Sequence, residues 1–203
     1  MPQVQGSISK IIRKVAENKD VVSIYLAKPE DRKLCDYRCG QFVTLRFQRE
    51  DGEWSEPHPF TLSSAPDDDF LRVTIKRAGD FTRTVQDAIH EGDAVLLSGT
   101  YGRFCHTAVH HHRLVLIAGG VGITPFLSVL RHLRATGSAS GVVLFWANRT
   151  WQDVFAREEL GALGRDLALK VVHVLSRERE TSSGADPFLE HVELGHIDSE
   201  ILR

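Results

Sequence analysis

The 203-residue sequence lacks several features that would place it in common protein classes. Its three cysteines, Cys35, Cys39 and Cys105, are an odd number without the paired spacing of metal ligands, and an ordinary iron–sulfur cluster needs four thiolates. No apolar run reaches the roughly 18 residues of a membrane helix, and no signal peptide begins the chain. We therefore expect a soluble cytoplasmic chain, or a cytoplasmic module of a membrane-associated system, with reduced thiols and no metal site.

Strong charge of either sign is also missing. The formal net charge is −2, which argues against a general nucleic-acid surface or an anionic-membrane surface, because both require a clustered basic excess. The run His110-His111-His112 is the one local concentration of histidine. Adjacent histidines do not converge easily on one ion, so a solvated linker is the expectation. The length allows two small domains or one large one.

The first half of the chain has the pattern of a small antiparallel β-barrel. Short segments rich in β-branched and aromatic residues are separated by turn formers at regular spacing. A short helix from Phe81 to His90 is expected to interrupt them. The six predicted strands are Ser7–Glu17, Val21–Ala27, Gln41–Gln48, His58–Leu62, Leu71–Arg77 and Ala94–Gly99.

From Arg113 onward, buried strands alternate with helices, which is typical of a doubly wound parallel α/β domain. The boundary is expected between Phe104 and Arg113, which gives domains 1–108 and 109–203. Residues 177–186 are polar and turn-rich, so they are expected to form a loop. The predicted strands are the apolar run that starts at Leu114, Val142–Asn148 and Leu167–Leu175, and the predicted helices are Phe126–Arg134 and Val154–Leu163.

A glycine-rich turn follows the first strand of this second half. Gly119, Gly120 and Gly122 lack the Cβ atoms that would hold a ligand away from the backbone, and glycine permits positive φ. The helix that follows offers unpaired N–H groups and a positive dipole end, which suit a pyrophosphate. Pro125 fits its first turn. The alternative is a tight strand-to-helix connection with no ligand.

The barrel half contains a second candidate anion site. The segment from Glu56 to Pro66 begins a strand between prolines and ends in several hydroxyls. Further along, Ile75 to Thr82 is a basic strand end that leads into a glycine turn and a helix start.

A barrel pattern with these segments is followed in the chain by Gly-Gly-Val-Gly-Ile-Thr-Pro. This combination resembles the ferredoxin–NADP reductase superfamily. The resemblance is closest to the flavin dehydrogenase modules of the NADPH oxidase and ferric reductase group. It implies that FAD lies along His58-Pro59-Phe60-Thr61, with Phe60 beside the isoalloxazine ring and with His58 and Thr61 bonded to the ribityl and phosphate part. FMN is the alternative, although the branch that uses it carries arginine where His58 stands. The second flavin segment implied by the resemblance comprises Ile75, Lys76, Arg77, Gly79, Phe81 and Thr82.

The resemblance also assigns a pyridine nucleotide site, for NADPH or NADH. Thr124 is expected near the nicotinamide, and an arginine near the adenosine would favour the 2′-phosphate of NADPH. For Ser176-Arg177, the alternative is a plain polar loop that binds no ligand. The residues implied are the loop Gly119, Gly120, Gly122, Ile123 and Thr124, together with Asn148, Arg149, Ser176 and Arg177.

The chain departs from the family in two places. Relatives place another strand ending in Cys-Gly-Pro after a segment like Leu194 to Arg203, and that strand is absent here. Either the chain is a piece of a longer protein or it has lost efficient nucleotide turnover, and an unpaired sheet edge is expected to result. Cys39 stands where relatives usually carry proline, which we interpret as a tolerated change in a turn.

The sequence thus predicts a module that transfers a hydride from NAD(P)H to FAD and electrons onward to an acceptor. The acceptor could be a haem, an iron–sulfur protein, ferric iron or oxygen. No catalytic acid or base is assigned, because hydride transfer needs none. The main alternative is a flavin-binding electron-transfer or regulatory subunit without its own nucleotide turnover. A scaffold with two vestigial sites is the third hypothesis.

Overall fold

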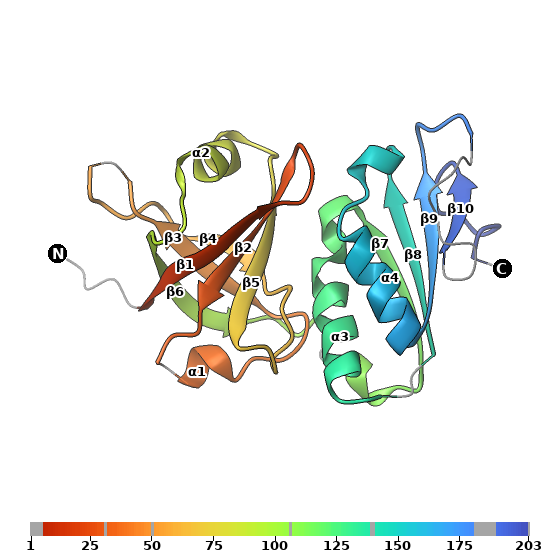
Figure 1. Ribbon diagram of the computed structural model, residues 1–203, viewed down its shortest axis with the longest axis horizontal. Helices are drawn as coiled ribbons and strands as arrows, with labels where there is room; N and C mark the ends of the chain where they lie inside the picture. Colours follow the sequence, from red (N-terminus) through yellow and green to blue (C-terminus); the bar gives the residue numbers. More distant parts are fainter. Residues whose placement is uncertain are drawn as a thin grey trace. The chain divides into compact units, whose positions relative to one another are not determined.

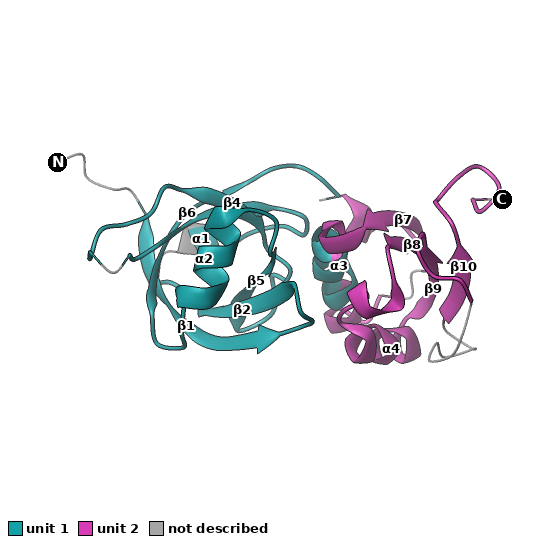
Figure 2. Ribbon diagram, turned by 90° about the horizontal axis from the view of Figure 1, so that it is seen from above, with its two compact units in different colours: residues 1–106, 124–132 teal, residues 107–123, 133–203 magenta. Residues whose placement is uncertain are grey.

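The structure, a computed structural model, describes residues 6–30, 32–49, 51–105, 107–138, 141–180 and 190–202 (Figure 1). The chain divides into two compact units (Figure 2). The first comprises Met1–His106 and Thr124–His132, and the second comprises Thr107–Ile123 and Leu133–Arg203. The first nine residues of helix α3 (Thr124–Ala135) therefore group with the first unit, although they follow the first strand of the second.

The first unit is built on a six-stranded antiparallel sheet in the order β4-β3-β6-β1-β2-β5. Leu62, just after β4, makes an isolated antiparallel bridge to Val73 of β5, so the two outer strands of the sheet meet. The six predicted strands are confirmed, with ends that differ by at most two residues. They are β1 (Ser7–Ala16), β2 (Val21–Ala27), β3 (Phe42–Phe47), β4 (His58–Thr61), β5 (Phe70–Lys76) and β6 (Ala94–Tyr101).

The core of this unit follows from strand alternation. In β3, Val43, Leu45 and Phe47 are buried, whereas the residues between them are half-buried, as expected for a strand with one face inward. The predicted helix appears as α2 (Asp80–Ala88), and Val85 is one of its buried residues. A short helix, α1 (Arg32–Cys35), was not expected from the sequence.

The second unit contains a parallel sheet in the order β10-β9-β8-β7. Leu114, Leu116 and Ala118 of β7 are buried. On the other face, Val115 is 66% exposed and Ile117 is 50% exposed. The helices here are α4 (Arg157–Asp166) and the 3₁₀ turns η1 (Ala108–His110), η2 (Gly120–Ile123) and η3 (Trp151–Asp153). The strands are β7 (Arg113–Gly119), β8 (Gly141–Asn148), β9 (Ala168–Leu175) and β10 (Glu190–Leu194).

Two predictions for this unit need correction. The predicted helix Val154–Leu163 begins three residues later, because Val154 and Phe155 are buried as extended chain and Ala156 adopts a left-handed φ of 53° before α4 starts. Strand β10, which was not predicted, pairs in parallel with β9. Within the described part of the chain, the sheet has two edge strands, β10 and β7, each with one partner strand. Of the predicted loop 177–186, residues 181–186 lie outside the described residues.

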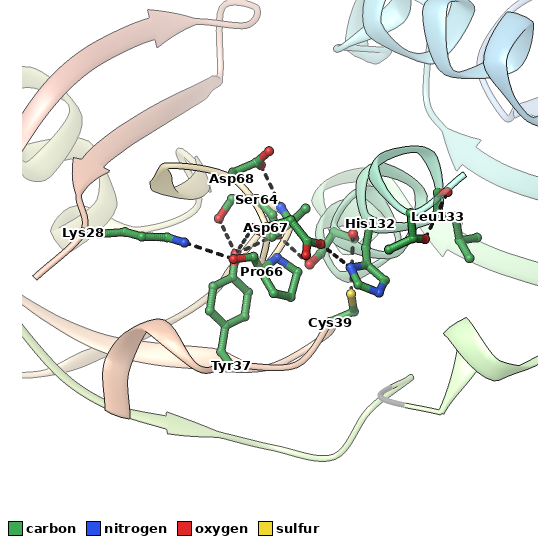
Figure 3. A network of polar contacts seen from close by, with 12 residues as sticks. Lys28, Tyr37, Cys39, Ser64, Pro66, Asp67, Asp68, His132 and Leu133 are labelled. Carbon is green, nitrogen blue, oxygen red and sulfur yellow. Dashed lines mark hydrogen bonds and ion pairs between the residues drawn. The ribbon is translucent and has the colours of Figure 1, made fainter. Parts of the chain in front are cut away.

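A buried polar network fixes the segment that follows β4 (Figure 3). The Tyr37 hydroxyl lies 2.7 Å from the Ser64 hydroxyl and donates to the carbonyl of Ala65 at 2.6 Å. The Ser128 hydroxyl of α3 donates to the Ser64 carbonyl at 2.6 Å, within the same unit. Buried groups held by several hydrogen bonds occupy one arrangement, so this network sets where β4 ends.

Candidate functional site

Strand β4 presents alternate residues to opposite sides. His58 pairs with Leu45 and Phe60 pairs with Val43, and both partners are buried core residues of β3. His58 and Phe60 therefore lie on the same side of β4, whereas Pro59 and Thr61 lie on the other. Nδ1 of His58 is 2.9 Å from the Glu56 carbonyl, which can only accept, so Nδ1 carries the hydrogen.

Aromatic contacts join the two predicted flavin segments. The ring of His58 stacks on the ring of Phe81, with a centroid distance of 3.3 Å and an interplanar angle of 8°. The ring of Phe47 lies 6.4 Å from that of Phe60 and 6.2 Å from that of Phe81. Three residues predicted from two separate motifs, His58, Phe60 and Phe81, are thus brought together around Phe47, a core phenylalanine that the sequence had not indicated.

The turn before α2 is open backbone. A Cβ placed on Gly79 would meet no atom within 4 Å, so a ligand can approach this turn closely. The Thr82 hydroxyl accepts the N–H groups of Ala78 and Gly79 at 2.9 and 3.1 Å. The first N–H groups of α2 have no intrahelical acceptor, which makes this helix start a place where an anion is stabilised.

The basic residues beside this turn differ in their contacts. Arg77 forms an ion pair with Asp87 of α2, and its Nε donates to Gln86 at 3.3 Å. The guanidinium of Arg77 therefore anchors α2 to the end of β5. Ile75 is 1% exposed and belongs to the core. Lys76, the last residue of β5, is half-buried.

The glycine loop of the second unit is positioned by a tryptophan. The indole N–H of Trp146 donates to the Gly120 carbonyl at 2.9 Å, and Gly120 has a positive φ of 49°. A Cβ on Gly119 or Gly122 would meet no atom within 4 Å, so the surface of the loop is backbone. Ile123 is fully buried and Thr124 is 5% exposed, so both side chains are packed inward.

The residues predicted for the adenosine side lie at the carboxyl ends of two neighbouring strands. The N–H of Ser176 donates to the Asn148 carbonyl at 3.1 Å, and that of Arg177 donates to the Arg149 carbonyl at 2.7 Å. Asn148 is 8% exposed, and its amide nitrogen has no hydrogen-bond partner in the structure. Because buried polar groups are almost always hydrogen-bonded, an orphaned amide here fits a missing polar ligand.

Sequence reasoning missed a neighbouring cluster centred on Trp151. Its backbone N–H donates to the Glu178 carboxylate at 2.8 Å, and the Arg157 guanidinium lies over its ring at 4.2 Å. The ring of the fully buried His173 is 4.9 Å away. Trp151, which directly follows Asn148-Arg149-Thr150, could have indicated this cluster from the sequence. A large aromatic residue at a strand end offers a flat surface on which a nucleotide base can stack.

The cysteines do not form a reactive centre. All three are free thiols, and burial raises the pKa of Cys39 to about 11 and that of Cys105 to about 12. Such thiols stay protonated at neutral pH and are poor nucleophiles. The described residues contain no cluster of His, Cys, Asp or Glu suited to a metal ion, and none of their helices is long and apolar enough to cross a membrane.

Comparison with protein-family models gives two matches. Residues 7–120 match the "FAD-binding domain" model, and residues 116–199 match the "Oxidoreductase NAD-binding domain" model. The first model covers more than half of the chain. The two models together span nearly all of it.

Curated relatives extend this result. A flavohemoprotein of Bacillus subtilis (strain 168) is 29% identical over 194 residues, which cover 95% of this chain and 48% of the relative. The reductase component of propane 2-monooxygenase from Rhodococcus jostii (strain RHA1) is 33% identical over 166 residues, covering 81% of this chain and 44% of the relative. The chain thus spans about half the length of these relatives.

Solved structures share the fold. The flavohem-like FAD/NAD binding domain of nitric oxide dioxygenase from Vibrio cholerae has a TM-score of 0.77 at 23% identity, covering 96% of this chain and 80% of that one. A ferredoxin NADP+ reductase from Neisseria gonorrhoeae has a TM-score of 0.73 at 22% identity, covering 98% and 76%. The chain therefore belongs to the ferredoxin–NADP reductase superfamily and consists of an FAD-binding domain joined to an oxidoreductase NAD-binding domain.

Proposed function

We propose that the chain is a reductase module that takes a hydride from NADPH or NADH onto FAD and passes electrons to an acceptor. Its domains are 1–108 for the flavin and 109–203 for the nucleotide. The observation that carries the proposal is that both phosphate-type turns are open backbone, since a Cβ at Gly79, Gly119 or Gly122 would touch nothing within 4 Å. Two such turns in one chain suit two pyrophosphates.

The residues of the first unit fit FAD. The Glu56 carbonyl occupies Nδ1 of His58, which carries the hydrogen, so Nε2 is the ring atom that would accept a hydrogen bond from a ribityl hydroxyl. Phe60 would cover one side of the ring system and exclude water. The N–H groups at the start of α2 would bind the pyrophosphate, and the Thr82 hydroxyl, which donates to the Gly79 carbonyl at 3.0 Å, would hold the turn beside it. Lys76 would supply charge, because Arg77 is held by Asp87.

The residues of the second unit fit a pyridine nucleotide. The glycine loop would hold the pyrophosphate, and the orphaned Asn148 amide would donate to the adenosine part. Arg149 and Arg177 are both exposed and follow adjacent strands, with their backbones joined at 2.7 Å. Two guanidinium groups at one place suit a 2′-phosphate, which favours NADPH. When bound, the flavin would supply the redox chemistry.

Haem is the acceptor that we favour among those expected, because relatives of this chain are named flavohemoproteins. Iron–sulfur proteins, ferric iron and oxygen are the other acceptors that a flavin can serve. We place this activity in the cytoplasm, where reduced pyridine nucleotides are found.

The test is an anaerobic absorbance titration of the purified chain loaded with FAD, first with NADPH and then with NADH. Bleaching of the flavin band at about 450 nm, with NADPH effective at lower concentration, is the expected result. A bound flavin that stays oxidised would point instead to an electron-transfer subunit without nucleotide turnover. A chain that binds no flavin would refute the proposal.

A further inference from the structure

A polar pocket lies in the first unit outside the residues assigned to the flavin and the nucleotide. Its volume is about 540 Å³, and all of its lining residues belong to the first unit. The lining comprises Asp36, Arg38, Gln41, Thr100, Gly102 and Arg103.

Two loops that are distant in the sequence form the pocket. One precedes β3, and the other comprises the end of β6 and the residues that follow it. The Gln41 side chain connects the two. Its Oε1 accepts the N–H of Arg38 at 2.8 Å, and its Nε2 donates to the Gly102 carbonyl at 3.2 Å. Both ends of this amide are thus used within the protein, so the walls of the pocket are held in place without a ligand.

The backbone at Gly102 keeps one wall free of a side chain. Gly102 has a φ of +94°, which an L side chain rarely adopts, and a Cβ there would lie 3.3 Å from the Phe42 ring. The Phe42 ring packs in turn on Tyr101, with centroids 5.6 Å apart. The missing Cβ therefore leaves room for the Phe42 ring, and Gly102 itself lines the pocket.

Charge in the pocket differs from that of the whole chain. The chain carries a formal net charge of −2, yet two arginines and one aspartate line this pocket. Each wall contributes one guanidinium, Arg38 from the first loop and Arg103 from the second. Guanidinium groups form paired hydrogen bonds with carboxylates, and two on facing loops suit a ligand with two separated anionic groups. Asp36 would repel a bare polyanion but would accept a hydrogen bond from a hydroxyl.

We propose that this pocket binds a small hydroxylated polycarboxylate, with one carboxylate on Arg38, another on Arg103 and a hydroxyl on Asp36. The Thr100 hydroxyl and the backbone of Gly102 complete the polar lining. The pocket is next to the flavin segment, because the Leu62 N–H, directly after Thr61, donates to the Gln41 carbonyl at 3.0 Å. The binding itself needs neither flavin nor nucleotide, so it goes beyond the proposed function.

The test is a titration of the unloaded chain with citrate at constant ionic strength, followed by calorimetry and by backbone amide NMR shifts. The expected shifts centre on Gln41 and Gly102. Replacing either arginine, R38Q or R103Q, should weaken citrate binding about tenfold, because each removes charge-assisted hydrogen bonds. R49Q is the matched control, since Arg49 is an exposed arginine paired with Asp51 outside the pocket. It should leave the affinity unchanged.

Further ligands decide the chemical class. Tricarballylate, which lacks the hydroxyl of citrate, should bind more weakly than citrate to the natural chain. D36A, which removes the hydrogen-bond acceptor, should bind the two ligands equally well. Inorganic phosphate that binds as tightly as citrate would overturn the polycarboxylate assignment. Absence of citrate binding, shifts elsewhere on the chain, or equal loss in R49Q would overturn the site. The shift map of the unaltered chain decides the location even if a variant fails to fold.

The citrate titration contains neither FAD nor NADPH. A negative result in it can therefore be distinguished from a negative result in the anaerobic titration of the FAD-loaded chain.

Discussion

The imidazole of His58 stacks on the ring of Phe81, with centroids 3.3 Å apart and planes 8° from parallel. These residues come from β4 and from the first turn of α2, two segments that are implicated separately in flavin binding. Their contact couples the position of the strand to that of the helix start. Both Nε2 of His58 and the open N–H groups of α2 are thereby set at one place on the barrel.

Removing the stack should weaken FAD binding without unfolding the barrel. F81A is expected to raise the Kd for FAD by up to about tenfold, the range of a single aromatic contact. F81W keeps an aromatic face and should lose less. Fluorescence quenching of FAD during titration measures the affinity. H90A is the control, because His90 has an exposed side chain beyond the end of α2. Equal affinities for F81A and the natural chain would contradict the assignment.

Asn148 should show opposite effects on stability and on ligand binding. Its buried amide nitrogen has no partner, and an unsatisfied buried polar group costs about 1–3 kcal/mol. N148L is therefore expected to leave the melting temperature unchanged or to raise it, while NADPH binds more weakly. Differential scanning calorimetry with and without NADPH measures both. A variant that loses stability and keeps its affinity would show that the amide serves folding instead.

Arg149 and Arg177 should distinguish the two nucleotides. R177Q, and more strongly R149Q/R177Q, is expected to reduce the affinity for NADPH by about tenfold or more and to change that for NADH little. The physical reason is that only NADPH carries a 2′-phosphate. R179Q, which changes an exposed arginine two residues along the same loop, is the control. Parallel losses for both nucleotides would indicate a general electrostatic effect.

Stability should fall at alkaline pH through the buried thiols. Burial raises the pKa of Cys39 from 9.0 to about 11 and that of Cys105 from 9.0 to about 12. Between pH 9 and these values the unfolded chain has lost protons that the folded chain retains, so deprotonation favours unfolding. The contribution of the Cys39 thiol to the free energy of unfolding is complete below pH 9 and is lost as the pH rises through about 11.

Urea unfolding at pH 8 and at pH 10 measures this effect. The free energy of unfolding should decrease between the two values, and C39A should show a smaller decrease. Cys35 is the natural comparison, because its side chain is only half-buried. The same decrease in C39A and in the natural chain would rule out Cys39 as a source.

Much of the fold could be predicted because local pattern dictates it. Strict alternation in β3, the continuous apolar run in β8 and the mostly apolar segment of β9 favour strand over helix without any knowledge of tertiary contacts. Strand β10 escaped prediction because Glu190 and Glu193 interrupt its apolar pattern. The predicted start of α4 was wrong because Val154 and Phe155 are buried as extended chain. This burial is a tertiary effect, and it outweighs the helical spacing of the apolar residues.

Glycine turns and aromatic motifs are local features, so the residues available for phosphate and ring contacts could be named from the sequence. How these residues are used follows from the tertiary structure. It stacked His58 on Phe81, joined Arg77 to Asp87, and left the Asn148 amide buried without a partner. These outcomes depend on the pairing of strands and helices far apart in the chain, and a side chain's partners follow from that pairing rather than from its neighbours in sequence.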